Sequence, residues 1–270
     1  MGLFGKLFEK KICSVCSGEI GLLGNRKLED GNLCKNCAKK LSPWFDERRH
    51  STVEQIKAQL AYREENQKKV AAFNVTRSFG QGTKILLDED KRQFMIAKTS
   101  NIIEENPDVL DIRQIISCDL DVHENRTEEK RRNDDGSYVS YNPPRYTWHF
   151  DFTFSLKVNH PYFDDMHFDL NSASVNIRSC DIPVSRGIFG GQYAPTEHPD
   201  YKKFEFMANE LRTVLNQLRQ QKREEVNSQP MATPVQVNTP QQPVVTVCPA
   251  CGATVKAAKF CEYCGTPMNG

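Results

Sequence analysis

Hydrophobic and polar residues alternate without interruption over residues 146–158, in the middle of the chain. Because successive side chains of a β-strand point to opposite faces of its sheet, this pattern predicts an antiparallel strand with one buried face and one solvated face. The apolar positions of this segment are Trp148, Phe150, Phe152, Phe154, Leu156 and Val158.

Shorter segments before and after this strand also have strand-like patterns of apolar and polar residues. Residues 83–87 and 93–97 flank a polar turn and predict a hairpin, and alternation recurs over 112–122 and 166–170. The apolar parity then shifts by one residue before the pattern resumes at 173–177, which predicts a β-bulge.

Two segments between or after the strands are read as loops. Residues 124–135 are densely charged and end in Asp-Gly, which predicts a solvated hairpin tip, and their nearly balanced charge disfavours a phosphate-binding groove. Residues 185–192 are glycine-rich but lack the spacings of nucleotide-binding loops.

Two segments have helical periodicity. Residues 52–73 follow Ser51, which is placed to form a capping box with Glu54. The charged faces of this segment, which include Arg63, predict a solvated connecting helix. The second helix spans roughly 200–225, and its apolar stripe can cover one end of a sheet. That stripe consists of Phe204, Met207, Leu211, Val214, Leu215 and Leu218.

Strands followed by one long amphipathic helix predict a central antiparallel β-sheet domain of the α+β class. The order of elements resembles the pleckstrin-homology or GRAM-like superfold, in which a C-terminal helix plugs a strongly bent sheet. This resemblance bears on the fold and carries no inference about function.

Eight of the ten cysteines form four CxxC pairs, arranged as two couples of pairs near the two ends of the chain. Two thiolates three residues apart can bind one metal ion from a tight turn, and two such pairs complete the tetrahedral shell of zinc. We therefore predict two structural Zn²⁺ ions; the alternatives are unrelated thiol pairs or a redox CxxC. The expected ligands are Cys13, Cys16, Cys34 and Cys37 in the first site, and Cys248, Cys251, Cys261 and Cys264 in the second.

The domain division follows from these patterns. The segment 227–246 is rich in Pro, Gln, Thr and Ser, a composition that predicts a flexible linker. The predicted units are an N-terminal four-cysteine zinc module at 1–50, a connecting helix at 51–73, the central β-rich domain at 74–226, that linker at 227–246, and a zinc ribbon at 247–270.

Charge and hydropathy limit the partners and the cellular compartment that we expect for this chain. With 36 Lys and Arg against 35 Asp and Glu, the net charge of +1 gives no global attraction to nucleic acid or to an anionic membrane. We see no signal peptide and no apolar run long enough to span a bilayer, so we expect a cytoplasmic protein. Residues 1–11 are amphipathic through Leu3, Phe4, Leu7 and Phe8. Packing against the zinc module, or simple fraying, is favoured over peripheral membrane contact.

Two parts of the chain resemble known families. Residues 13–72 resemble the largely bacterial domain of unknown function 4428, through CSVC, EIGLLGNRKLEDG, LCKNC and the KKLSPWF…STVEQIKAQL segment. The C-terminus is similar to bacterial zinc-ribbon or double-zinc-ribbon domains through CPACG and FCEYCG. These resemblances imply zinc binding and a bacterial origin, and they imply no activity.

No catalytic residue is predicted. The polar parity of the strands carries His149, Asp151, His167 and Asp169, but the simplest hairpin register separates them. That register pairs residue 157 with 167 and residue 155 with 169. Cys118 falls on an apolar parity and reads as a core residue, while Cys180 has no neighbouring His to activate it. Sites with four thiolates leave no open metal position, so we expect no enzyme activity.

The pattern favours a non-catalytic zinc-binding adaptor that binds a protein partner through the central domain and the tethered ribbon. One alternative is nucleic-acid binding, for which the ribbon carries too few cations. The basic residues that would serve this alternative are Lys35, Lys39, Lys40, Arg48, Arg49, Lys256 and Lys259. The other alternative is a peripheral membrane-associated protein that attaches through residues 1–11.

Overall fold

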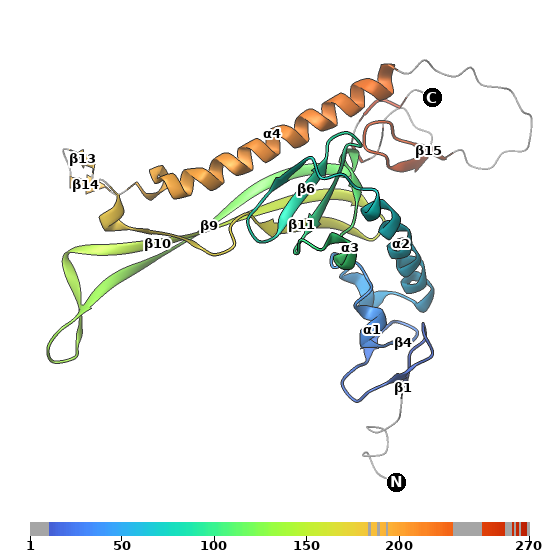
Figure 1. Cartoon of the computed structure of the whole chain (residues 1–270), viewed down its shortest axis with the longest axis horizontal. Helices are drawn as coiled ribbons and strands as arrows, with labels where there is room; N and C mark the ends of the chain where they lie inside the picture. Colours follow the sequence, from blue (N-terminus) through green and yellow to red (C-terminus); the bar gives the residue numbers. More distant parts are fainter. Residues whose placement is uncertain are drawn as a thin grey trace, which may run out of the picture.

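The computed structural model describes residues 11–182, 185–187, 190–192, 194–228, 245–256, 261, 263–264 and 266–268. Residues 1–10 and 229–244, on which the predicted amphipathic segment and most of the predicted linker fall, lie outside the described residues. The chain is a mixed α+β structure with antiparallel sheets (Figure 1). No helix in the described ranges contains an apolar window long enough to cross a bilayer.

The N-terminal module consists of two very short hairpins and a single helical turn. Strand β1 pairs with β2 and β3 pairs with β4, after which α1 begins. The module has its own small apolar cluster, to which the next helix contributes Ile56. The bounds are β1 Lys11–Ile12, β2 Glu19–Ile20, β3 Arg26–Lys27, β4 Asn32–Leu33 and α1 Lys35–Ala38.

Helix α2, Val53–Ala71, follows the short 3-10 turn η2, Glu47–His50. Its capping box is formed by Thr52 and Gln55, one residue later than predicted. The predicted Ser51 instead donates its hydroxyl to the backbone oxygen of Glu47 (2.8 Å) and is buried. A capping box was correctly predicted at the start of this helix. Its position was off by one residue because Ser51 and Thr52 are adjacent and either hydroxyl could have formed it.

The first sheet has the strand order β5-β6-β7-β8. One of its faces belongs to the main core, and the other packs against the far end of α2 through Val70. Helix α2 thus contacts the metal module at one end and this sheet at the other. The bounds are β5 Arg77–Phe79, β6 Lys84–Asp88, β7 Gln93–Ala97, α3 Ile102–Glu105 and β8 Leu110–Asp111; the predicted hairpin is present within one residue.

The second sheet is built around the long strand β10. Strand β9 pairs along one side of β10, and β11 and β12 pair with successive parts of its other side. The predicted alternation is realised, since every even position from Trp148 to Val158 is buried. The bounds are η3 Ile112–Gln114, β9 Ile115–Arg132, β10 Tyr138–His160, β11 Phe163–Asp169 and β12 Val175–Arg178.

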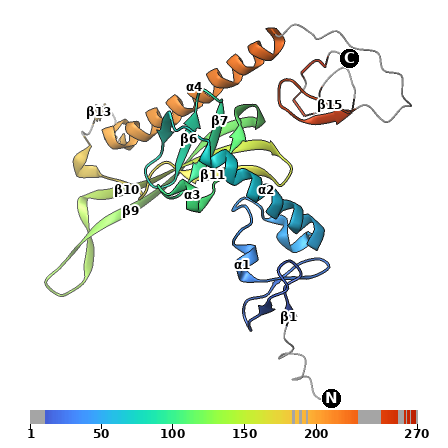
Figure 2. The same cartoon turned by 45° about the vertical axis from the view of Figure 1, so that its right-hand side comes forward.

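Strands β9 and β10 extend beyond the body as a two-stranded arm, which Figures 1 and 2 show projecting from the sheet. The predicted solvated hairpin tip is confirmed, because the two strands are joined by a turn at 133–137 that contains Asp135-Gly136. The predicted start of this loop at residue 124 was wrong, because β9 continues to Arg132. A strand with both faces in water needs no apolar parity, so charge alone did not exclude it. At the base of the arm, the Arg126 guanidinium lies 4.7 Å from the centre of the Tyr146 ring.

The structure differs from the predicted alternation of buried and exposed positions at two places. The segment after Leu170 is a turn that separates β11 from β12, so no β-bulge accounts for the shift in parity there. Near the start of β9 a register irregularity buries Ile115 and leaves Ile116 48% exposed, which reverses the predicted parity at this point.

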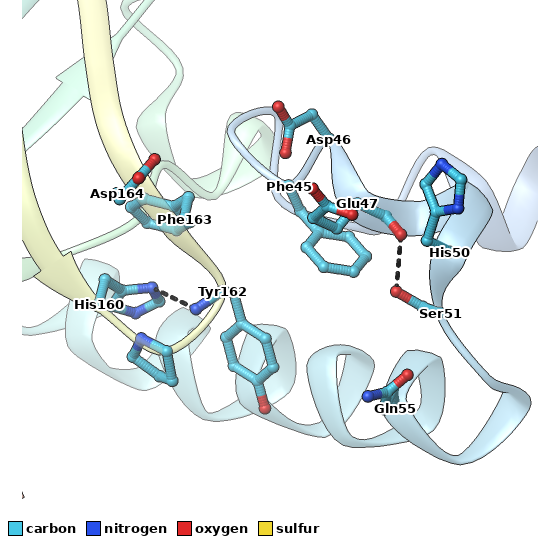
Figure 3. Close-up of a pocket in the computed structure, with 11 residues that line it drawn as sticks. Phe45, Asp46, Glu47, His50, Ser51, Gln55, His160, Tyr162, Phe163 and Asp164 are labelled. Atoms are coloured by element: carbon cyan, nitrogen blue, oxygen red, sulfur yellow. Dashed lines mark hydrogen bonds between the residues drawn. The ribbon is translucent and has the colours of Figure 1, made fainter.

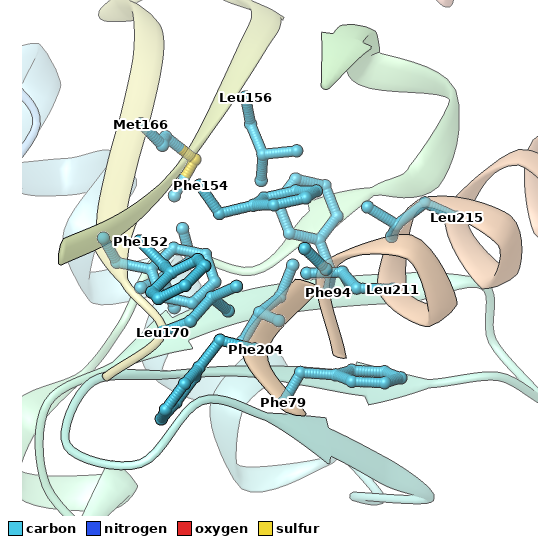
Figure 4. Close-up of a cluster of buried hydrophobic side chains, with 14 of the residues drawn as sticks. Phe79, Phe94, Phe152, Phe154, Leu156, Met166, Leu170, Phe204, Leu211 and Leu215 are labelled. Atoms are coloured by element: carbon cyan, nitrogen blue, oxygen red, sulfur yellow. The ribbon is translucent and has the colours of Figure 1, made fainter. Parts of the chain in front are cut away.

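Helix α4, Pro199–Ser228, extends slightly beyond both predicted ends and covers the second sheet (Figure 2). Most of its predicted stripe is buried, with Phe204 stacked on Phe152 of β10 at 5.2 Å between ring centres. Figure 4 shows side chains of both sheets converging on this helix. The glycine-rich segment is a paired hairpin, β13 Ser185–Gly187 with β14 Gly190–Gln192, where a loop was predicted. The remaining elements are η4 Ser179–Asp181, η5 Pro195–Glu197, β15 Val245–Val247 and β16 Thr254–Lys256.

Candidate metal centres and the adjoining groove

The first four predicted cysteines converge within the N-terminal module. Cys13 follows β1 and Cys16 lies in the turn after it, while Cys34 caps the N-terminus of α1 and Cys37 lies within that helix. Their Sγ atoms all lie within 4.8 Å of one another. The backbone N–H groups of Cys34 and Cys37 donate to the Sγ atoms of Cys13 (3.3 Å) and Cys34 (3.4 Å), which favours thiolates at these positions.

The separation of the sulfur atoms fits a tetrahedral metal site. With a Zn–S bond of about 2.3 Å, two ligands of a tetrahedron lie about 3.8 Å apart. The Sγ atoms of Cys16 and Cys34 are 3.8 Å apart. A disulfide would require about 2.05 Å, and all four cysteines are free. The donor set therefore fits one thiophilic ion.

The pKa values of two cysteines in this group also indicate that a bound cation is needed to ionise all four thiols. Burial acts to raise the pKa of Cys13, but hydrogen bonds from the backbone at Cys16, Cys34 and Val15 outweigh it and lower that pKa to about 6. Burial and the neighbouring sulfur atoms raise the pKa of Cys37. One thiolate is thus favoured by the protein alone, whereas four so close together need a bound metal to offset their charge.

The second group is built in the same way at the other end of the chain. Strands β15 and β16 pair through Val245–Val247 and Thr254–Lys256, and the turn between them carries Cys248 and Cys251. The Sγ distances are 3.5 Å from Cys248 to Cys264 and 3.6 Å from Cys251 to Cys261. Gly252 has a φ of +75°, a conformation that favours glycine and lets the first pair form its turn.

Hydrogen bonding again distinguishes the individual sulfur atoms. Burial opposes ionisation of Cys264, but hydrogen bonds from the hydroxyl and the backbone N–H of Thr266 lower its pKa to about 6. Burial raises the pKa of Cys248 and of Cys251. Both cysteine groups can therefore each hold a metal ion, and four thiolates would fill a tetrahedral shell without leaving a position for water.

The other residues singled out in the sequence do not form a common site. The Nδ1 atom of His149 lies 2.5 Å from Oδ1 of Asn176 on β12, and Thr153 donates to Asp169 on β11. Asp151 accepts from Ser174 (2.7 Å), within the turn before β12. His167 lies against Trp44 of the N-terminal region, with ring centres 6.1 Å apart.

The predicted hairpin register was offset by two residues. Ser155 pairs with His167 and Lys157 with Asp165, because β10 runs on to His160 and the turn to β11 is shorter than assumed. Cys118 is half-buried beside the core, as expected of a core position, and Cys180 is exposed near Asp181.

Sequence reasoning missed a buried polar network that joins the metal module to the central domain. The Arg63 guanidinium donates to Asp108 Oδ1 at 2.8 Å, to the backbone oxygen of Asn106, and to that of Lys40 at 3.3 Å. The hydroxyl of Ser42 donates to the other oxygen of Asp108 at 2.7 Å. The expectation that Arg63 lies on a solvated face was wrong, since it is 6% exposed.

The sequence spacing of Arg63 relative to two apolar residues of α2 could have predicted that Arg63 is buried. Arg63 lies seven residues after Ile56 and seven before Val70, so all three share one face of α2. Both apolar neighbours are buried, which places Arg63 on the buried side of the helix. A charged residue on such a stripe needs a partner of opposite charge, and Asp108 supplies it.

A groove lies where the metal module meets the turn between β10 and β11. Its volume is about 540 Å³, and the 3-10 turn η2 forms one wall, the β10–β11 turn the other, and the start of α2 the floor (Figure 3). Burial lowers the pKa of His160, at the end of β10, to about 4, so this ring is neutral at pH 7. The lining residues are Phe45, Asp46, Glu47, His50, Ser51, Gln55, His160, Pro161, Tyr162, Phe163 and Asp164.

The same turn borders a second cavity, on the side of the zinc-ribbon-like segment. This cavity has a volume of about 420 Å³, and Gly252, Ala253 and Thr254 of the second cysteine module line it together with residues near η3. Pro161 lines both cavities. The two cysteine modules thus flank one turn of the central sheet.

Comparison with known proteins agrees with the N-terminal resemblance. Residues 11–59 match a family described as Domain of unknown function (DUF4428), a segment that contains the first four cysteines and the start of α2. No curated protein and no solved structure matches the chain. The family match does not extend to the central domain, whose fold is therefore known from its structure alone.

Proposed function

We propose that this chain is a non-catalytic, cytoplasmic zinc protein that acts as an adaptor between other proteins. One Zn²⁺ ion stabilises each cysteine module, and the central domain, with its pleckstrin-homology-like order of elements, is the body to which both modules attach. The observation that carries the proposal is that both modules form a cavity against the same β10–β11 turn, where Pro161 lines each cavity.

The chemistry of the two cysteine groups supports a structural role for the metal. Four thiolates complete the shell of zinc, so neither ion would keep a position for a substrate or an activated water. The strand residues His149, Asp151 and Asp169 are engaged in three separate hydrogen-bonded contacts. These features favour binding over catalysis.

The contacts around Arg63 support coupling between the parts. Because Ser42 and Arg63 both bind Asp108, the metal module is held in a fixed position against the central domain. A fixed position matters for an adaptor, since a groove between two parts keeps its shape only if those parts do not separate.

The nucleic-acid alternative has less support. Lys35, Lys39 and Lys40 are exposed, but Asp46 and Glu47 lie close to Arg48 in the sequence and are also exposed. Mixed charge of this kind weakens the attraction to phosphates that non-specific nucleic-acid binding requires.

Metal content and partner capture test the proposal together. The full chain, purified without chelator, should contain two zinc ions by elemental analysis, and each cysteine module variant should lose one. Crosslinked capture from the host should give a discrete protein in near-stoichiometric amount that survives nuclease treatment. Recovery of nuclease-sensitive nucleic acid or of lipid in its place would overturn the adaptor proposal.

A further inference from the structure

The groove between η2 and the β10–β11 turn combines aromatic walls with exposed carboxylates. Phe45 comes from the metal module, while Tyr162 comes from the turn that faces it across the groove and Phe163 from the start of β11 (Figure 3). The Phe45 and Tyr162 rings lie edge to face with centres 6.2 Å apart. The groove is therefore partly apolar, and its aromatic walls are held by contacts between distant parts of the sequence.

The carboxylates of this groove have no cation of their own. Asp46, Glu47 and Asp164 line it and are exposed, and among the described residues no Lys or Arg belongs to the lining. Within the part of the chain that the structure describes, none of these three carboxylates has an ion pair or a side-chain hydrogen bond. The adjacent Asp165 differs, because its carboxylate lies 3.8 Å from Lys157 across the sheet.

His160 does not offset this charge at neutral pH. Burial holds the pKa of His160 near 4, and its ring is stacked on Phe163 with centres 4.1 Å apart. The nearby cation Lys69 also lies outside the groove: it is placed over the Tyr62 ring, 6.0 Å from its centre, and neither residue belongs to the lining. His50 is exposed at the rim. The described lining thus contains three carboxylates and no Lys or Arg, and its buried histidine, His160, is neutral at pH 7.

We propose that this groove binds a lysine or arginine side chain presented by a peptide segment of a partner protein. An ammonium or guanidinium group is attracted to aromatic faces and to carboxylates at once, and this combination distinguishes it from apolar and anionic ligands. A volume of about 540 Å³ accommodates one long side chain with its flanking backbone. Nucleic acid would meet like charge here.

This inference deepens the adaptor proposal and rests on it, since it names the chemistry of the partner. It also assigns a role to the fixed position of the metal module, because Phe45, Asp46 and Glu47 reach the groove only while that module stays against the sheet. Loss of the first metal ion should therefore remove the binding site along with the module.

The test uses the zinc-loaded full chain and three short peptides that are identical except for a central Arg, citrulline or Glu. Binding is measured by the amide shifts of Gln55, Tyr162 and Phe163 in ¹⁵N spectra. The Arg peptide should bind and the Glu peptide should not, while citrulline, which keeps the shape of Arg without its charge, should bind at least about fivefold more weakly. Equal binding of Arg and citrulline, or no shift at millimolar peptide, would overturn the inference.

The decisive variant is Glu47→Gln combined with Asp164→Asn, which keeps shape and removes two charges from exposed positions. It should weaken Arg-peptide binding at least about fivefold, whereas the matched control Asp165→Asn, next in sequence but outside the groove, should change it less than about twofold. Circular dichroism and zinc content establish that both variants fold.

The same variants separate this inference from the adaptor proposal. If the Glu47→Gln, Asp164→Asn chain still captures its host partner while the Arg peptide fails to bind wild type, the groove assignment is wrong and the adaptor proposal stands. If the Arg peptide binds as expected but no protein partner is captured by wild type, the adaptor proposal fails and the groove is a cation site of another use.

Discussion

The guanidinium of Arg63 lies 2.8 Å from the carboxylate of Asp108, and both side chains are almost fully removed from solvent. Asp108 also accepts the hydroxyl of Ser42, which belongs to the metal module. Three parts of the chain thus meet at one buried carboxylate. This contact joins the metal module to the central domain, together with the ring contacts of Trp44 with His167 and of Phe45 with Tyr162.

Replacing Arg63 with Ala should destabilise the protein by about 3–5 kcal/mol, because it leaves Asp108 buried without a compensating charge. The measurement is urea unfolding of the zinc-loaded chain followed by circular dichroism. The matched control is Arg178→Ala, which breaks the exposed Arg178–Asp181 pair and should have little effect. An equal effect of both variants would show that the buried pair does not join the two parts.

Replacing Cys34 with Ser should remove one of two zinc ions and unfold the metal module, since metal binding is worth about 10–16 kcal/mol in small zinc peptides. The start of α2 should lose helicity because Ile56 packs into that module. The sheet signal should remain. Cys180→Ser, which changes an exposed cysteine outside both groups, is the control. Loss of all strand signal would mean that the module and the sheet unfold as one unit.

His160 gives the protein a specific acid sensitivity. Burial lowers its pKa in the folded state from 6.5 to about 4, so the unfolded chain binds a proton at this site more readily than the folded chain does. Stability should therefore fall as the pH drops from about 6.5 towards 4, and the loss is complete below the folded pKa.

The variant His160→Phe isolates this contribution, because it keeps a ring stacked on Phe163 and cannot be protonated. Its stability, measured by urea unfolding between about pH 4 and pH 7, should fall less steeply than that of wild type. Acid release of zinc affects both chains equally, so the difference between the two curves reports His160. Parallel curves would contradict the assignment.

The β9–β10 arm should be dispensable for folding. Beyond the pair of Glu129 and Arg145, no side chain of the arm is buried in the described structure. Replacing residues 130–144 with Asn-Gly should therefore change the free energy of unfolding by less than about 1 kcal/mol, since Asn-Gly suits a tight hairpin turn. Unfolding in urea is the measurement, and a larger loss would mean that the arm helps to hold the sheet together.

Sequence patterns predicted those features that are local. The CxxC spacing identified the two groups of cysteines that converge, because each pair lies within one turn of chain. The alternation from Trp148 to Val158 predicted the buried face of β10, because the core lies on one side only. Helix α4 was predicted for the same reason, from a stripe that faces one core.

Features that depend on long-range pairing could not be predicted in this way. The spacing of Ile56, Arg63 and Val70 could have indicated that Arg63 is buried, but its partner Asp108 lies on a loop far along the chain and could not be identified from the sequence. The arm looked like a loop because both faces of its strands are solvated and carry charge. The groove combines Phe45 with Tyr162, and no local pattern connects these two residues.

The most direct test of the adaptor account places a photo-crosslinking amino acid at Gln55, on the floor of the groove, in the full chain expressed in its own host. After irradiation and nuclease treatment, mass spectrometry should identify a discrete protein, crosslinked within a few residues of a Lys or Arg. The yield should fall in the Glu47→Gln, Asp164→Asn background and stay unchanged in Asp165→Asn. Crosslinks to nucleic acid or lipid alone, or no crosslinked product, would contradict the account.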